Sequence, residues 1–210
     1  MLKNKKTRVL FIILTIMVCF LAIIEVKNMI DLKNKKTSVV LVNKKIGIYD
    51  VSPNQSNYEK ELEPLLLKAL SNKDDTTITN EVSKYFISEY FSLKDKNNYN
   101  QVGGLGFILE ANRNNFKTNA VDSYYRDYAQ FKKVYEQAQL PLITNVEIIK
   151  RTDKKRSVIS NNTNLNKVVD IDVKWSYEDN NINNIVSSII VRLVKDKDNN
   201  WYIYELISNN

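Results

Sequence analysis

Histidine and cysteine, which often serve as catalytic bases, nucleophiles and metal ligands, are nearly absent from this sequence. The chain contains no histidine and one cysteine, Cys19, which lies inside an apolar segment. Nucleophilic systems that use histidine as the base are therefore excluded, as are the commonest zinc and iron sites. Outside that segment no thiol is available as a nucleophile or for a disulfide. We expect no enzymatic activity, no catalytic residue, no metal site and no cofactor.

Two short motifs resemble ligand-binding loops without completing them. Residues 195–200 read KDKDNN, but this run lacks the glycine and the terminal glutamate of a calcium-binding loop. Gly103, Gly104 and Gly106 form VGGLGF, but no Lys-Ser/Thr follows as in a phosphate-binding loop. We interpret the first motif as a solvated turn. The second indicates a flexible joint or a close approach between helices.

Tyrosine is the most unusual residue of the part of the chain that follows the apolar segment. The sequence has 12 tyrosines, several of them spaced along one predicted helix. They could pack at the edge of the core with their hydroxyl groups in water, or they could form a protein-contact face, since tyrosine is enriched at binding hot spots. Both interpretations remain open. The candidate protein-interaction residues are Tyr85, Tyr90, Tyr124 and Tyr128.

The N-terminal region predicts attachment to a membrane. Residues 9–24 are apolar except for Thr15 and would span about 24 Å as a helix, close to a hydrocarbon core of about 30 Å. A cleaved signal peptide is the alternative, but no small-x-small site follows the apolar run. Basic residues precede the segment, so we expect residues 1–8 in the cytoplasm and the rest outside it. The predicted location is the inner (cell) membrane, with single-pass attachment through residues 9–27 and the C-terminal domain in the periplasm or outside the cell.

The charge distribution argues against a nucleic-acid partner. The formal net charge is +7, and Lys3, Lys5, Lys6 and Arg8 contribute to it before any acidic residue appears. The remaining excess is small and is spread along the chain, unlike the clustered basic surface of a nucleic-acid-binding protein.

Periodicity then predicts helices first and strands last. A juxtamembrane linker and extended arm cover residues 28–57, and the domain covers residues 58–210. Helical spacing is found at 62–70, with Pro64 near the start, at 76–93 and at 118–139, which is the longest pattern. Strand patterns follow at 143–150, 168–177, 185–194 and 201–207. The predicted fold class is α+β: an N-terminal transmembrane helix, then helices packed on a curved antiparallel sheet of about four strands.

Residues 82–100, VSKYFISEYFSLKDKNNYN, form an aromatic-rich stretch followed by Lys94, Asp95, Tyr99 and Asn100. Together with the order of the elements, this stretch resembles the inner-membrane scaffold family of type IV secretion systems, the eighth VirB component. The resemblance implies a periplasmic domain similar to nuclear transport factor 2. It also implies a structural role in assembling a secretion or conjugation channel, with other channel components as partners and a possible homo-oligomer.

Two other functions remain open. The first is a membrane-anchored domain of the same fold that binds a small molecule or acts as an enzyme, since aspartate and tyrosine alone can transfer protons. An apolar cavity lined by a buried carboxylate and a tyrosine would favour it, whereas a cavity filled by Trp175, Trp201 and phenylalanine side chains would favour the scaffold. The second is an anchored surface protein with no role in secretion.

Overall fold

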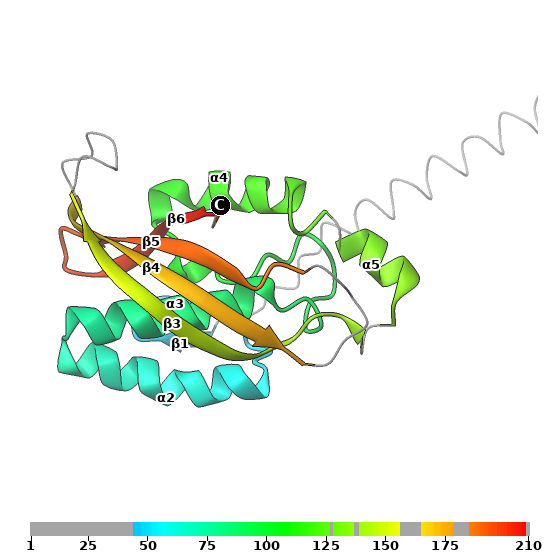
Figure 1. Ribbon diagram of the computed structural model, residues 1–210, viewed down its shortest axis with the longest axis horizontal. Coiled ribbons are helices and arrows are strands. Elements are labelled where there is room, and N and C mark those ends of the chain that lie inside the picture. The colour runs from blue at the N-terminus through cyan, green and yellow to red at the C-terminus, as the bar shows by residue number, and fades with distance from the viewer. Residues whose placement is uncertain (1–43, 127, 137–138, 156–164, 179–184, 209–210) are drawn as a thin grey trace, which may run out of the picture. The chain divides into compact units, whose positions relative to one another are not determined.

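The described part of the chain forms a short hairpin, then helices, then a sheet. The computed structural model describes residues 44–126, 128–136, 139–155, 165–178 and 185–208, all within the compact unit Asn43–Asn210. The elements in chain order are β1 (Lys44–Ile46), β2 (Tyr49–Val51), α2 (Asn57–Asn72), α3 (Asp75–Phe91), the 3₁₀ turn η1 (Leu105–Phe107), α4 (Glu110–Asp122), α5 (Tyr128–Val134), β3 (Ile143–Lys154), β4 (Leu165–Tyr177), β5 (Ser188–Asp196) and β6 (Trp201–Ile207) (Figure 1).

The sheet is built from strands that are neighbours in sequence. Its order is β3-β4-β5-β6, and each pair is antiparallel. In β4 the alternation seen in the sequence places Val169, Ile171, Val173 and Trp175 in the core. Antiparallel neighbours of this kind need only short connections, so the four C-terminal strands form the sheet without a crossover.

Helices α2 and α3 begin at well-defined caps. The side chain of Ser56 accepts a hydrogen bond from the backbone of Glu59, whose carboxylate accepts one from the backbone of Ser56, so the two residues form a capping box. The box starts α2 at Asn57, earlier than the predicted 62–70 helix, and leaves Pro64 inside the helix. Asp74 caps α3 through the backbone of Thr77.

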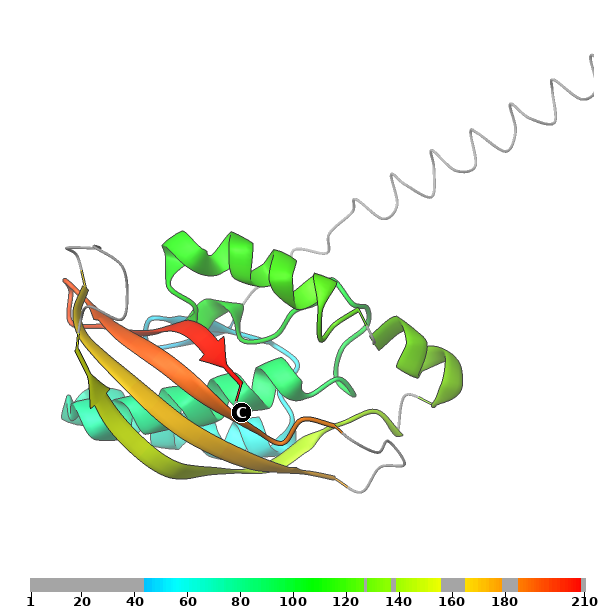
Figure 2. The same cartoon turned by 45° about the horizontal axis from the view of Figure 1, so that its top comes forward.

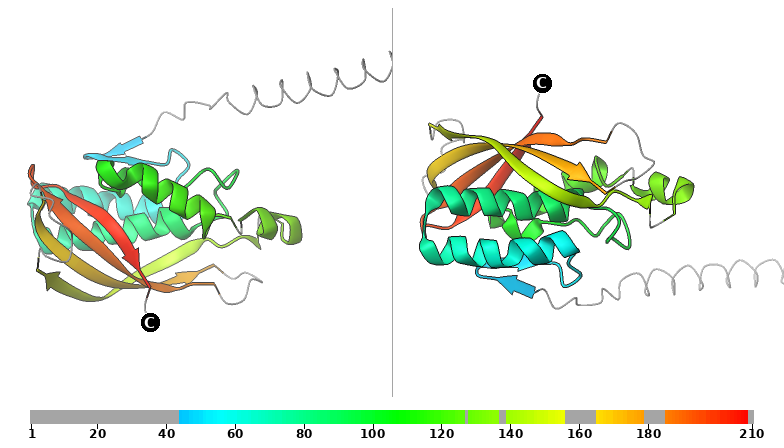
Figure 3. Two further views of the ribbon diagram at one scale, coloured as in Figure 1. Left: turned by 90° about the horizontal axis from the view of Figure 1, so that it is seen from above. Right: turned by 60° about the horizontal axis from the view of Figure 1, so that its bottom comes forward.

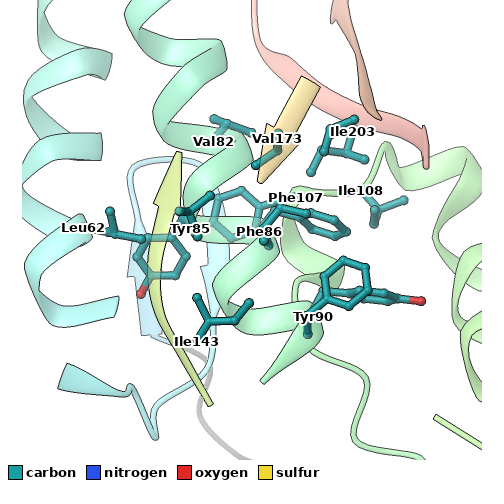
Figure 4. Packing of buried hydrophobic residues seen from close by; sticks show 14 of the residues in the cluster. Leu62, Val82, Tyr85, Phe86, Tyr90, Phe107, Ile108, Ile143, Val173 and Ile203 are labelled. Carbon is teal, nitrogen blue, oxygen red and sulfur yellow. The ribbon is translucent and has the colours of Figure 1, made fainter. Parts of the chain in front are cut away.

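The core lies between the sheet and α3. Figures 2 and 3 show α3 along one face of the curved sheet and α2 packed against α3. Figure 4 shows side chains from α3, β3, β4, β6 and the η1 region meeting in this layer. Among its members are Val82, Phe86, Phe107, Val173 and Ile203.

The hairpin β1–β2 belongs to the compact unit rather than to a linker. Its residues Ile46, Tyr49 and Val51 are buried in the main core. Gly47 makes the turn with φ +59°, a backbone conformation that glycine adopts without strain. The Tyr49 hydroxyl donates a hydrogen bond to the carbonyl of Trp201 at 2.7 Å. The linker and extended arm predicted for residues 28–57 therefore include two strands, although residues 28–43 lie outside the described ranges.

The helix predicted over 118–139 is broken. Helix α4 ends at Asp122, and α5 begins at Tyr128. Ser123 leaves the helical conformation, with φ −122° and ψ −103°, and the Tyr125 backbone N–H bonds to the carbonyl of Ala120. The tyrosine spacing suggested one continuous helix. In the structure Tyr124 and Tyr125 belong to the non-helical segment and Tyr128 to the start of α5, and all three pack in or against the core.

The prediction of a fold that begins with a transmembrane helix was wrong as stated. No helix in the ranges described above is long and apolar enough to cross a membrane. Both α2 and α3 carry several charged side chains, which a membrane-spanning helix largely excludes. Residues 9–27, to which the prediction referred, lie outside the described residues. The corrected fold class is α+β, with helices α2 to α5 and one four-stranded antiparallel sheet.

Candidate functional site

The four candidate tyrosines lie inside the domain. Tyr85, Tyr90 and Tyr128 are 0%, 5% and 2% exposed, and Tyr124 is half-buried against the core. The hydroxyl groups of Tyr124 and Tyr128 donate to the carbonyls of Phe91 at 2.9 Å and Lys96 at 2.5 Å. Their positions give these tyrosines a packing role, and Tyr90 also lines a surface groove between α4 and β6.

The buried hydroxyl groups are poor acids at neutral pH. Burial raises the pKa of Tyr85 and of Tyr90 well above the usual value for tyrosine. The Tyr85 hydroxyl accepts a hydrogen bond from the side-chain amide of Gln55. The ring of Tyr90 stacks on Phe86 at 5.4 Å between centroids. Neither tyrosine is placed to exchange a proton with a substrate.

The most unusual site in the described residues is a buried cluster of four ionisable side chains. Glu59 from α2, Glu89 from α3, and Asp95 and Lys96 from the following loop come together although they are distant in sequence. Glu59, Glu89 and Lys96 are 0%, 2% and 3% exposed. The Lys96 amine contacts the carboxylate of Asp95 at 2.9 Å and 3.0 Å. A charge removed from water in this way requires both an opposite charge and hydrogen bonds.

Hydrogen bonds to the two glutamates tie several segments together. The carboxylate of Glu89 accepts one bond from the backbone of Ser52 at 2.6 Å and another from the backbone of Gly104 at 3.0 Å. The carboxylate of Glu59 accepts from the backbone of Ser56 at 2.9 Å and lies 3.3 Å from the Ser88 hydroxyl. The cluster thereby joins the end of the hairpin, α2, α3 and the glycine-rich loop.

Burial and mutual repulsion disfavour the ionised glutamates. Burial and the neighbouring Glu89 raise the pKa of Glu59 to about 7. Burial also raises the pKa of Glu89, although Lys96 opposes the shift. Burial alone would lower the pKa of Lys96, but the surrounding carboxylates raise it. Three carboxylates therefore surround one ammonium group, and the raised pKa of both glutamates favours their protonated forms more than in water.

The glycine-rich motif supports this cluster by close backbone approach. A Cβ atom on Gly103 would lie 2.0 Å from the carbonyl oxygen of Glu89, and one on Gly106 would lie 1.9 Å from that of Asp50. Gly104 has φ +73° and lies against the ring of Phe86. The motif therefore lets the loop touch α3 and β2. This is a close approach, but it joins a loop to a helix and a strand, not two helices as one of the two interpretations predicted.

A second polar centre lies at the start of α3. The carboxylate of Asp75 accepts hydrogen bonds from Lys195 at 2.7 Å, Lys167 at 2.8 Å and the Trp201 indole at 3.0 Å. Partial burial would raise the pKa of Asp75, but these donors lower it below its usual value. Because its donors come from β4, β5 and β6, this centre fixes the helix to the sheet.

The interior between α3 and the sheet is filled by aromatic rings. Phe91 stacks on Trp175 with 4.5 Å between ring centroids, and Trp201 is 1% exposed. The grooves lined by described residues include one of about 750 Å³ beside the start of α2, one of about 490 Å³ beside Asp75, and one of about 530 Å³ between α4 and β6. Neither Glu59 nor Glu89 lines any of these three grooves.

Sequence reasoning missed the buried charge cluster. Glu59 and Glu89 stand in helical segments where a glutamate normally faces water, and only the Ser56-to-Glu59 spacing of a capping box gave a local signal. The described residues contain no group of three or more potential metal ligands arranged to hold an ion.

Comparison of the chain with protein families, curated proteins and solved structures gives no match. The fold and its polar centres therefore define the protein's class: an α+β domain with a filled aromatic interior and an internal ion cluster.

Proposed function

We propose that this protein is a structural assembly component that acts through protein–protein contacts. The observation that carries the proposal is the filled space between α3 and the sheet, where Phe91 stacks on Trp175 and Trp201 is buried. A domain that binds a small molecule or catalyses a reaction needs a concave, partly apolar site. Here the corresponding volume is occupied by the chain's own aromatic side chains, which leaves the outer surface as the functional part.

The polar centres favour the same conclusion. The carboxylates of Glu59 and Glu89 accept hydrogen bonds from backbone N–H groups. Neither carboxylate lines one of the three grooves described above. Asp75 accepts hydrogen bonds from three donors, and it also lines the groove of about 490 Å³. These groups fix the helices, the hairpin and the sheet relative to one another, as expected of a rigid domain that presents surfaces.

The finer proposal is a component of a type IV secretion or conjugation channel at the inner membrane. It is supported by the order of helices followed by four sequential antiparallel strands and by the resemblance of residues 82–100 to the channel scaffold family. The partners would be other channel components, with self-association possible. The location and the membrane attachment through residues 9–27 remain predictions from the sequence.

The decisive experiment is capture of the full-length protein from its native membrane. The tagged protein is crosslinked in intact cells, purified under denaturing conditions, and its covalent partners are identified by mass spectrometry. We expect other channel components to be enriched. The matched control adds the crosslinker only after detergent extraction, which retains chance contacts made after lysis but removes assemblies that depend on the membrane.

Recovery of the protein alone, at high yield and with active crosslinker, would contradict the assembly role. Enrichment of envelope proteins unrelated to secretion would contradict the channel assignment while leaving a contact role in place. In that case the alternative of an anchored surface protein without a secretion role would be preferred.

A further inference from the structure

The groove between α4 and β6 is the surface feature that the domain itself leaves unexplained. It has a volume of about 530 Å³ and is lined by one face of α4 and by the end of β6. Figure 2 shows α4 running beside β6 at the edge of the sheet. Ala120 is the only fully buried residue of α4, and Phe116 and Val121 pack against the core while remaining partly exposed.

The register of the sheet shows that the groove follows the edge of β6. Glu205 lies opposite Arg192, whose guanidinium binds Asp170 on one face of the sheet. Leu206 lies opposite Val191, which is buried in the core on the other face. Directly opposed residues of an antiparallel pair project on the same side. Glu205 and Leu206 therefore project to opposite faces, and a groove lined by both must open along the strand edge.

This edge is already used once for strand-like pairing. Ile108 forms a parallel bridge with Ile203, and the backbone N–H of Leu109 donates to the carbonyl of Ile203 at 3.1 Å. The chain then turns into α4. Beyond the bridge, β6 is the last strand of the sheet among the described residues, and its residues Tyr204, Glu205 and Leu206 line the groove. Unpaired strand edges of this kind accept an added strand.

The opposite wall carries a stripe of amide side chains. Asn112, Asn115 and Asn119 are spaced three and four residues apart on α4 and line the groove together. Within the described chain their side-chain amides have no hydrogen-bond partner. Each asparagine amide has an NH₂ group that can donate and a carbonyl oxygen that can accept. It can therefore pair with both the C=O and the N–H groups of a peptide backbone. Tyr90 and Phe116 supply an aromatic surface between the two walls.

The charges of the groove restrict what can enter it. The one ionisable carboxylate in its lining, Glu205, is paired with Arg192. The other lining side chains are amides, a hydroxyl, aromatic rings and aliphatic groups. A charged segment would lose its hydration without gaining an ion partner, so the lining favours an uncharged occupant.

We propose that this groove binds an extended, uncharged segment of a partner protein, which adds a strand to the edge of β6. Alternate side chains of the segment would contact the aromatic surface, and its backbone would bond to β6 on one side and to the amides of α4 on the other. The inference rests on the proposed function and names the surface through which assembly takes place.

Site-specific photo-crosslinking in the full-length protein tests this. Benzoylphenylalanine is placed at position 115, inside the groove, or at position 114 as the matched control, because Asn114 is an exposed asparagine of the same helix that does not line the groove. We expect strong crosslinking from 115 only, to a segment without charged residues. A synthetic peptide of that segment should bind the protein and slow amide hydrogen exchange at 205–207.

Blocking variants give the quantitative readout. We expect Asn115→Trp and, independently, Asn119→Arg to weaken peptide binding about tenfold or more, and Asn114→Trp to leave it within about twofold. Two blocking variants are used so that misfolding of one does not decide the outcome.

Equal crosslinking from 114 and 115, a charged or helical crosslinked segment, or unchanged exchange at 205–207 would overturn the groove proposal. If Asn115→Trp and Asn119→Arg still capture channel components at the wild-type level, the groove proposal fails and the assembly role stands. If the wild-type protein captures no partner, the assembly role itself fails. The proposal would also be overturned if the wild-type protein cosedimented with cell-wall glycan and Asn115→Trp did not. That result would show that the groove binds a carbohydrate and not a peptide.

Discussion

The carboxylate of Glu89 accepts a hydrogen bond from the backbone N–H of Gly104 at 3.0 Å, inside the domain and 15 residues away in sequence. The same carboxylate also receives the backbone N–H of Ser52, at the end of the hairpin. One side chain of α3 therefore holds two separate segments. Because this carboxylate is buried beside Glu59 and Lys96, the stability of the junction depends on protonation and on the single lysine.

The stability of the domain should fall as the pH rises through the titration of Glu59. The pKa of Glu59 is raised from 4.5 to about 7 in the folded state, so the folded protein binds more protons than the unfolded protein between these values. The free energy of unfolding therefore decreases across this window, by up to about 3 kcal/mol from this group. Glu59→Gln, which keeps the hydrogen bond to Ser56, should flatten this dependence.

The measurement is urea unfolding of both proteins at several pH values from 5 to 8. Glu61→Gln is the control, because Glu61 is an exposed glutamate of the same helix. Parallel curves for the wild type and Glu59→Gln would show that Glu59 does not titrate in this window.

Loss of the buried cation should destabilise the domain strongly. Lys96→Met leaves Asp95, Glu59 and Glu89 facing one another without the ammonium group that offsets their charge. We expect a loss of about 3–5 kcal/mol, larger at high pH where more of the carboxylates are ionised. Lys94→Met is the matched control: Lys94 pairs with Glu178 at the surface, and its loss should cost about 1 kcal/mol or less. Equal effects of the two substitutions in thermal unfolding would contradict the cluster.

The glycine-rich loop should not tolerate a single added methyl group. In Gly103→Ala the new Cβ would lie 2.0 Å from the Glu89 carbonyl oxygen, so the loop or α3 has to move. We expect a loss of about 1–3 kcal/mol and faster hydrogen exchange at the Gly104 amide, whose bond to Glu89 is disturbed. Asn97→Ala, at an exposed position of the same loop, is the control and should unfold like the wild type. An unchanged midpoint in Gly103→Ala would refute the close approach.

The tyrosines can be assigned to packing or to contact by removing one hydroxyl group. Tyr128→Phe loses the hydrogen bond to the Lys96 carbonyl, and we expect a loss of about 1 kcal/mol with unchanged partner capture. Tyr135→Phe is the control, since its hydroxyl has no hydrogen-bond partner in the described part of the chain. Reduced capture by Tyr128→Phe at unchanged stability would instead support the predicted contact role.

Several elements of the domain could be predicted from the sequence because local pattern and tertiary environment agree there. The alternation in β4 predicts which of its residues face the core, and the strand predicted over 201–207 coincides with β6. A sequence without histidine also excludes histidine-based chemistry regardless of the fold. These inferences depend only on residue type and on the two-residue period of a strand.

The break between α4 and α5 depends on interactions that the pattern does not contain. The tyrosine spacing fits a continuous helix, but Tyr125 lies buried with its hydroxyl bonded to the carbonyl of Tyr90, 35 residues away. This long-range bond competes with helix continuation and is invisible in a local window. The choice between packing and contact for Tyr85, Tyr90, Tyr124 and Tyr128 was likewise open from the sequence, since it depends on which faces of the helices are covered.

The sequence by itself determined that helices precede the four strands of the sheet, which side chains of β4 face the core, and the absence of histidine chemistry, since these follow from composition and short-range periodicity. Only the tertiary structure decided that Glu59, Glu89, Asp95 and Lys96 share one buried site and that α4 stands beside the free edge of β6. The physical reason is that the burial of a carboxylate, and the resulting shift of its pKa, depend on groups that are dozens of residues apart in sequence. In the sequence alone, each glutamate resembles an ordinary exposed residue of a helix.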